Sequence, residues 1–213
     1  MKNFFILIFN LTFVDDWSNL YYMKKETIES ILEIGTDLIL KNGYHNVGLN
    51  KILTEANIPK GSFYYYFKSK EDFGLQIIKF YSEKSLVILK SYLENDTKNH
   101  KQRIISFFKA MQDIYTAKNY KEGCLLGNCS TELSDFSESF SISIANELSV
   151  WQKCFEKCIQ EGQIKGNIKT NESPKILGDL ILTMWEGALL RMKSAKNVES
   201  IEIFILYLEK YIL

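Results

Sequence analysis

The sequence predicts an all-α fold, in which a small N-terminal helix-turn-helix unit precedes a larger helical domain. Apolar residues recur with the helical period along most of the chain, and no stretch alternates with the period of a strand. The 213 residues include only two prolines, which permits long uninterrupted helices. A hydrophobic fraction of 46% suffices for a stable core, and the length suits a small domain joined to a larger one.

The first 22 residues stand apart from the rest of the chain. The apolar run Phe4–Val14 follows Lys2 and resembles the core of a signal peptide, but no small-residue cleavage site follows it. The run is also too short to span a bilayer as a helix. Because Met23 directly precedes a suitable helix start, we expect residues 1–22 to be an N-terminal extension that is not native or not ordered. A membrane anchor or a packed extra helix is the alternative.

Residues 23–69 carry the pattern of a helix-turn-helix. A first helix is predicted over 25–42, closed by Asn42-Gly43, and a second over 49–56. Asn57 tolerates a left-handed turn conformation, and Pro59 suits the start of a third helix that ends near Phe67. Two short helices joined by a tight turn are typical of a unit that reads DNA.

The third of these helices contains five consecutive aromatic residues, from Phe63 to Phe67. Such a run has strand propensity, but its flanks favour a helix. At about 100° per residue, Phe63 and Phe67 share one face, which should pack against the first two helices. Tyr64 and Tyr65 then point away, where their hydroxyls can donate to phosphate and their rings can pack on a thymine methyl. On spacing alone, tyrosines that merely cover a core fit equally well.

The charge distribution is local rather than global. The formal net charge is zero, so the whole molecule does not attract nucleic acid. Between residues 51 and 70, however, four lysines face the single acidic residue Glu55. Local excesses of this size also occur on ordinary solvated surfaces.

Several positions at fixed spacing resemble the N-terminal domain of the tetracycline-repressor (TetR) family of transcriptional regulators. The match covers about residues 24–75 and consists of Gly43-Tyr44, Ile52, Ala56, Ile58, Lys60-Gly61-Ser62-Phe63-Tyr64-Tyr65-Tyr66-Phe67 and Ser69-Lys70-Glu71. The resemblance implies an all-helical homodimeric repressor that binds operator DNA, with a ligand-sensing C-terminal domain over 70–213.

The resemblance also assigns candidate DNA contacts, residue by residue. Lys60 and Ser62 would lie near bases or backbone, Tyr64 and Tyr66 near phosphates, and Lys70 on a phosphate at the start of the fourth helix. The full candidate set is Asn50, Lys60, Gly61, Ser62, Tyr64, Tyr65, Tyr66 and Lys70. The chain departs from the family pattern at Val47-Gly48, where hydroxyl residues are usual, at Asn57, where glycine is usual, and at Pro59, where serine is usual.

The C-terminal two thirds carry fewer motifs. Helices are expected over 69–93, 101–118, 124–136, 140–162, 173–194 and 199–212. The last two have apolar stripes, formed by Leu177, Leu180, Ile181, Met184, Trp185 and Ala188, and by Ile201, Phe204, Tyr207, Leu208 and Tyr211. The family resemblance favours a homodimer through 173–212, although packing within one subunit fits the stripes equally.

Four residues are candidates for an effector cavity: Cys124, Trp151, Trp185 and Glu186. Aromatic walls with few polar groups suit a mostly apolar ligand, although such residues are also ordinary core. The segment 123–128 resembles an element of one TetR subgroup, which includes regulators that answer to drugs or electrophiles. Cys124 is therefore the cysteine to test for thiol sensing. Burial as a small hydrophobe is favoured, because nothing near it supplies an obvious positive charge to stabilise a thiolate.

The cysteines do not indicate disulfides or a metal site. Cys124, Cys129, Cys154 and Cys158 form no dense framework, so we expect them to be reduced. The two histidines lie in other segments without paired ligand spacing, so neither a metal nor another cofactor is expected.

The sequence thus predicts a cytoplasmic, non-enzymatic regulator that is released from a palindromic operator by a small-molecule effector. It shows no Ser/His/Asp or Cys/His arrangement, and two histidines leave little room for acid–base chemistry. The long fourth helix joins both units, and we expect it to transmit the effect of the ligand from the C-terminal domain to the DNA-binding unit. The alternatives are a thiol- or electrophile-responsive regulator using Cys124, a helical ligand carrier or enzyme without DNA binding, and a membrane-associated protein held by Phe4–Val14. Stable membrane association is not expected.

Overall fold

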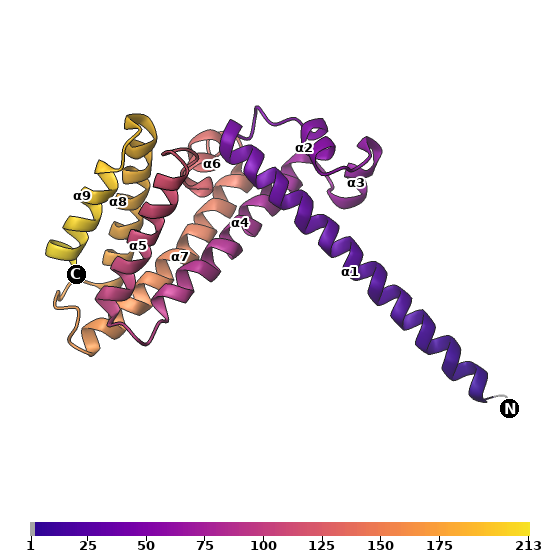
Figure 1. Cartoon of the computed structure of the whole chain (residues 1–213), viewed down its shortest axis with the longest axis horizontal. Helices are drawn as coiled ribbons and strands as arrows, with labels where there is room; N and C mark the ends of the chain where they lie inside the picture. The colour runs from indigo at the N-terminus through magenta and orange to yellow at the C-terminus, as the bar shows by residue number, and fades with distance from the viewer. Residues whose placement is uncertain (1–2) are drawn as a thin grey trace.

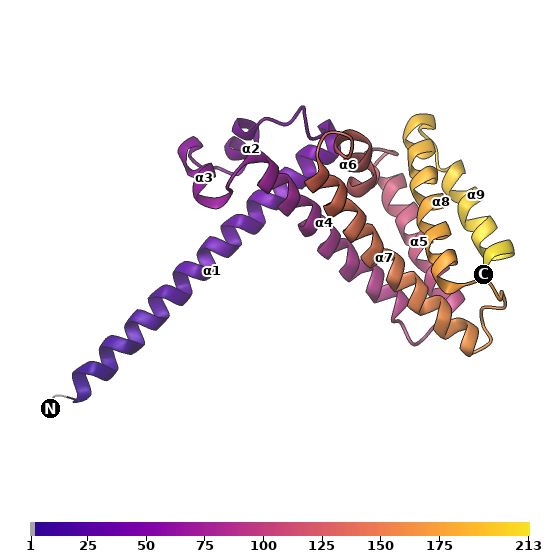
Figure 2. The ribbon, with the colours of Figure 1, turned by 180° about the vertical axis from the view of Figure 1, so that it is seen from behind.

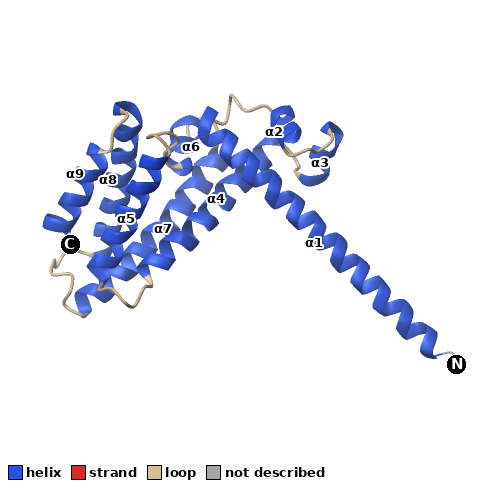
Figure 3. Cartoon of the chain, viewed as in Figure 1, coloured by secondary structure: helices blue, strands red, loops and turns tan. Residues whose placement is uncertain are grey.

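The structure is a computed structural model, which describes the backbone of residues 3–213 and the side chains from Met23 onward. Within that range, helices and the loops between them account for the whole fold, and no strand is present (Figure 3). The predicted all-α class is confirmed. Figure 1 shows a bundle of helices with a smaller helical unit at one end and one long helix that projects away.

The projecting helix is α1, which spans Asn3–Asn42. Its predicted start near residue 25 is wrong, because the helix begins at Asn3. The sequence explains the difference, since neither proline nor glycine interrupts the chain from Asn3 until Gly35. The side chains of residues 1–22 lie outside the described ones, so their assignment as an extension or an anchor stays a prediction.

The end of α1 and the next three short helices form the small unit. The second helix, α2, spans Leu49–Glu55, and Asn57 has the predicted left-handed conformation, with φ 55°. The predicted continuous third helix is divided: η1, a 3₁₀ turn, spans Lys60–Ser62 and α3 spans Phe63–Tyr66. Phe67 ends the helix with extended backbone, at φ −132° and ψ 137°.

The long helix α4 connects the small unit to the bundle. It spans Lys70–Leu93, and Ser69 caps it by accepting a hydrogen bond from Asp72 N–H at 3.0 Å. The bundle also contains α5 (His100–Ala117), α7 (Glu138–Ile164), α8 (Pro174–Ala195) and α9 (Glu199–Tyr207), which continues as the π-helical turn η2 (Leu208–Ile212). Both ribbon views show α4 and α7 side by side along the bundle (Figures 1 and 2).

A short helix, α6, lies between the small unit and the bundle. It spans Leu125–Leu133, which is shorter than the predicted range 124–136. Cys124 forms its N-cap instead of its first turn, and Ser137 accepts the Phe140 N–H to start α7 soon after α6 ends. This position gives α6 contacts with α1, α4 and α7 (Figure 1).

Candidate functional site

Three buried phenylalanines fix α3 to the start of α4. Phe63 and Phe67 are each 1% exposed, and Phe73 is fully buried. The Phe67 and Phe73 ring centroids are 4.8 Å apart, and Phe63 lies 5.3 Å from Phe67 and 5.8 Å from Phe73. Phe63 and Phe67 therefore pack inward as predicted, and the other face of α3 is left free.

The tyrosines lie on that free face. Tyr64 is 72% exposed and Tyr65 is 65% exposed, whereas Tyr66 is half-buried. Tyr65 is tied to its surroundings, because the Lys24 ammonium lies 4.2 Å from its ring centroid and the Tyr66 ring meets it edge-on at 4.9 Å. Tyr64 is thus the most exposed of the three tyrosines, and its contact with a phosphate stays a prediction.

Three further candidates, Lys60, Gly61 and Ser62, form η1 directly before α3, and Asn50 lies in α2. Lys60, Gly61 and Asn50 are exposed, and Ser62 is half-buried. A Cβ built on Gly61 would meet no atom within 4 Å, so packing inside the protein does not require glycine there. A missing side chain at an exposed turn leaves room for close approach by an outside group, as expected of a backbone that contacts DNA.

Lys70 has a role inside the protein that the sequence did not reveal. Its ammonium donates to the Tyr44 carbonyl at 3.2 Å and lies 4.7 Å from the Tyr44 ring centroid. The Tyr44 hydroxyl in turn donates to the Lys70 carbonyl at 2.9 Å. Lys70 therefore supports the junction between α1 and α4, and its phosphate contact stays a prediction.

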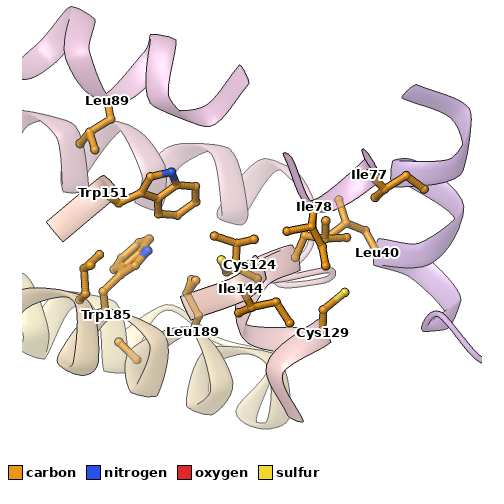
Figure 4. Close-up of a cluster of buried hydrophobic side chains, with 14 of the residues drawn as sticks. Leu40, Ile77, Ile78, Leu89, Cys124, Cys129, Ile144, Trp151, Trp185 and Leu189 are labelled. Atoms are coloured by element: carbon orange, nitrogen blue, oxygen red, sulfur yellow. The ribbon is translucent and has the colours of Figure 1, made fainter. Parts of the chain in front are cut away.

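A partly open cavity of about 60 Å³ lies inside the bundle, and its 13 lining residues come from α4, α5, α7, α8 and the α6 N-cap. Its walls are mostly aromatic. Trp151 and Trp185, both predicted for such a site, lie close to Cys124 in the same part of the core (Figure 4). The Trp151 indole N–H donates to Ser82 Oγ at 3.0 Å, so its polar atom is already paired. The lining consists of Tyr81, Ser85, Ile88, Leu89, Phe107, Phe108, Met111, Tyr115, Cys124, Trp151, Phe155, Leu182 and Trp185.

Glu186, the fourth residue predicted for the effector site, does not line this cavity. It borders a separate groove of about 620 Å³ between α6 and α8, and Cys124 borders both spaces. A Cβ at Gly127 would collide with Glu186 Oε2, so the glycine lets the carboxyl group lie directly against α6. The other oxygen, Oε1, is buried without a hydrogen-bond partner among the described residues.

The electrostatics around Cys124 favour the neutral thiol. Burial raises the pKa of Cys124 well above its ordinary value, and the Glu186 carboxylate raises it further. The N–H groups of Gly127 and Leu126 at the start of α6 lower it only in part. Burial likewise raises the pKa of Glu186 and of the tyrosines Tyr81 and Tyr115.

Tyr81 and Tyr115 are functional candidates that the sequence analysis missed. Neither tyrosine was among the candidate residues for an effector cavity. Their periodicity is that of core residues, and only the three-dimensional packing brings both beside Cys124 and Glu186.

All four cysteines are free. No group of three His, Cys, Asp or Glu residues suited to a metal occurs in the part of the chain that the structure describes.

The apolar stripes of the last two helices lie mostly inside the subunit. The prediction that these stripes form a dimer interface is therefore wrong for most of their residues, because their side chains are buried within the subunit. The buried residues are Leu177, Ile181, Trp185, Ala188, Ile201, Phe204 and Leu208. Another set of apolar residues on α8, α9 and η2 is exposed: Ile176, Leu180, Leu190, Ile203, Leu206, Tyr207 and Tyr211. Below, these seven residues are called the α8/α9 face. Only Leu180, Tyr207 and Tyr211 belong to both the predicted stripes and this face.

Comparison with known proteins identifies the family. Residues 31–77 match the family model described as bacterial regulatory proteins of the tetR family. Residues 101–208, about half of the chain, match the model described as a tetracyclin repressor-like C-terminal domain. The chain belongs to the TetR family of transcriptional regulators. It is therefore a DNA-binding regulator and not an enzyme, and homodimers and ligand binding are typical of this family.

Relatives of this TetR-family protein match over most of their length. The HTH-type transcriptional repressor DhaR of Mycobacterium sp. is 36% identical, covering 83% of this chain and 87% of its own. The transcriptional regulator AcuR of Cereibacter sphaeroides is 30% identical, covering 78% and 75%. The crystal structure of Escherichia coli NemR in its reduced form superposes with a TM-score of 0.80 at 25% identity, covering 88% and 97%.

No described helix of this regulator combines the length and the apolar character needed to cross a membrane.

Proposed function

We propose that this TetR-family regulator is a repressor that leaves a palindromic operator when a small effector occupies the bundle cavity. The observation that carries the proposal is the separation of two features: an exposed Tyr64 face at one end and a largely aromatic cavity in the bundle. The names of two relatives, which describe DhaR and NemR as transcriptional repressors, support the direction of regulation.

The operator would be read by two copies of the small unit. A two-fold dimer places two such units in successive major grooves, about 34–36 Å apart. In each unit, Tyr64, Tyr66 and Lys60 would contact the backbone, and Ser62 and Gly61 would approach it closely. Tyr65, Asn50 and Lys70 complete the proposed set, with Lys70 shared between the DNA and Tyr44.

The dimer would form through residues 173–212, by the α8/α9 face. Seven exposed apolar side chains on α8, α9 and η2, which follow one another in the chain, would remain in water in a monomer. Gly187 lies on the same side of α8 as Leu180 and Leu190, and a Cβ there would meet nothing within 4 Å. Glycine inside a helix costs about 1 kcal/mol relative to alanine, so close approach of a second helix would account for it.

The effector would be a small and mostly apolar molecule. A cavity of about 60 Å³ offers about four to six water-sized positions. The aromatic walls favour an apolar body, and the hydroxyls of Tyr81, Tyr115 and Ser85 can bind one polar group. Occupancy would then shift the dimer to a spacing that the operator does not match, with typical coupling of roughly 5- to 150-fold in affinity.

Filling the cavity should abolish the response and spare DNA binding. Ser85→Leu places an extra side chain into the cavity from α4, and Ser91→Leu adds the same group to an exposed position of that helix. Short alcohols, aldehydes and acids of two to about six heavy atoms serve as probes. Compounds that raise the melting temperature of the wild type should weaken operator binding, and Ser85→Leu alone should lose both effects. A compound that binds the wild type but leaves operator affinity unchanged would contradict the proposal.

A second candidate function is thiol sensing, which the position of Cys124 at the α6 N-cap favours. The N–H groups of Leu126 and Gly127 are placed to stabilise a thiolate, but burial and Glu186 hold the pKa of the thiol high. The structural relative NemR was solved in a form described as reduced. Under this alternative, Cys124→Ser would abolish a response to oxidant while operator binding persists.

The pKa of Cys124 makes a direct prediction about its reactivity. Because that pKa is raised, alkylation by iodoacetamide should be slow at neutral pH and should accelerate only under alkaline conditions. Glu186→Gln removes the negative charge beside the thiol, so each unit by which the pKa falls should raise the thiolate fraction about tenfold. Mass spectrometry can follow Cys124 against the half-buried Cys154 as an internal reference. Equal rates in wild type and Glu186→Gln would show that the carboxyl group does not restrain the thiol.

A further inference from the structure

The helix α6 touches the cavity at one end and the DNA-binding unit at the other. Its N-cap residue, Cys124, belongs to the cavity lining. Its last turn carries Glu132, whose carboxylate accepts hydrogen bonds from the turn that follows α1. The Tyr44 N–H donates to Oε2 at 2.9 Å, and the His45 N–H donates to Oε1 at 2.7 Å. One side chain of the bundle thus holds two backbone groups of the DNA-binding unit.

The turn at residues 43–45 is built to receive this carboxylate. Gly43 ends α1 with φ +84°, a conformation that favours glycine. A Cβ at Gly43 would also lie only 3.2 Å from Glu132 Oε2. The backbone conformation therefore favours glycine at this position, and a side chain there would crowd the Glu132 carboxylate. Gly43 leads directly into the two N–H groups that Glu132 binds.

The side chain of Tyr44 prevents the turn from moving independently of the bundle. Tyr44 is buried, and its ring meets Phe140 of α7 edge-on at 5.2 Å. A Cβ on Gly74 of α4 would lie 2.6 Å from the Tyr44 ring, so the lack of a side chain at Gly74 makes room for this ring. The turn is consequently fixed at its backbone by α6 and at its side chain by α4 and α7.

We propose that Glu132 is the positioning residue through which the bundle cavity controls the DNA-binding unit. Displacement of the α6 N-terminus at Cys124 would move Glu132, and its carboxylate would carry the 43–45 turn, α1 and α2 with it. The inference rests on the proposed effector function, and it adds the side-chain contact through which α6 would act on the 43–45 turn. Charge-assisted hydrogen bonds to two adjacent N–H groups are directional enough to transmit a small shift.

A double-mutant cycle tests this coupling without any effector. Cys124→Met enlarges the side chain at the cavity wall. Glu132→Gln keeps the size of the side chain that binds the 43–45 turn but removes its charge and one hydrogen-bond acceptor. The readout is the affinity of the full-length dimer for an operator fragment recovered by selection from random DNA. Glu138→Gln, an equal change of charge at an exposed position of α7, replaces Glu132→Gln in the control cycle.

We expect Cys124→Met to change operator affinity in the wild-type background and to lose at least fivefold of that effect when combined with Glu132→Gln. The Glu138→Gln cycle should be additive within about twofold. Additive effects in both cycles would overturn the inference, and so would an operator affinity that Cys124→Met leaves unchanged. If the cycle shows coupling but no small molecule releases the operator, the inference stands and the proposed effector function fails.

Amide hydrogen exchange provides a second measurement that does not depend on DNA. In the wild type, the Tyr44 and His45 amides should be protected, and Cys124→Met should alter their exchange while melting remains cooperative. Glu132→Gln should abolish that alteration. Exchange at these two amides that is the same in the wild type and Cys124→Met would overturn the inference even if a variant proves too unstable for the binding assay.

Discussion

A Lys60→Ala/Tyr64→Ala variant is expected to lose at least about 100-fold of operator affinity and to keep its fold. Both side chains are exposed, so their removal leaves no cavity. A hydrogen bond to a charged group contributes about 1.5–3 kcal/mol, so two such contacts amount to about 3 kcal/mol or more in each half-site. At about 1.4 kcal/mol for each tenfold change, the contacts of one half-site alone account for about 100-fold, which is the stated minimum.

Fluorescence anisotropy at several salt concentrations measures this effect. Removal of Lys60 from both subunits should lower the salt slope by about two units if each lysine neutralises one phosphate. Lys169→Ala is the matched control, because Lys169 is exposed but lies far along the chain, between α7 and α8. Unchanged affinity in the double variant would refute the assignment of the DNA-binding residues.

A single charge on the α8/α9 face should convert the dimer to a monomer. Leu180→Asp places two carboxylates into a two-fold interface, and each buried ion costs several kcal/mol. A total of about 4 kcal/mol would weaken dimerisation about 1,000-fold. Because the operator is read by two linked units, operator binding should fall with it. Sedimentation equilibrium reports the oligomeric state, and anisotropy reports the affinity.

The control for this variant is Ile164→Asp. Ile164 is 79% exposed at the end of α7, whereas Leu180 is 40% exposed in the α8/α9 face. Ile164→Asp should leave both dimer and operator binding intact. A Leu180→Asp protein that stays dimeric and binds the operator normally would place the interface elsewhere.

The DNA-binding unit was largely predictable because its information is local. The spacing of Phe63 and Phe67, the left-handed Asn57 and the Ser69 cap all follow from a few neighbouring residues, and each is present in the structure. The continuous third helix was wrong because the first turn after Pro59 closes as a 3₁₀ helix. The length of α1 was also wrong, because local helix propensity continues through a segment interpreted as a separate extension.

The effector site was less predictable because it depends on packing between distant helices. Trp151 and Trp185 were found as isolated aromatic residues, but periodicity could not separate Tyr81 or Tyr115 from ordinary core. Periodicity identified apolar stripes on α8 and α9 but not which apolar residues face the subunit's own core. The clamp of Glu132 on Tyr44 and His45 joins residues 88 and 87 positions apart and left no local signal in the sequence.

Selection of bound fragments from random DNA, followed by footprinting, tests the central claim most directly. The wild type should enrich one palindromic sequence, whose half-sites lie about 10–10.5 base pairs apart or a multiple of that distance. The Lys60→Ala/Tyr64→Ala variant should enrich no sequence under the same conditions. Enrichment of the same palindrome by both proteins would contradict the assigned reading surface, and the absence of any enriched sequence with the wild type would contradict the account of a palindromic operator.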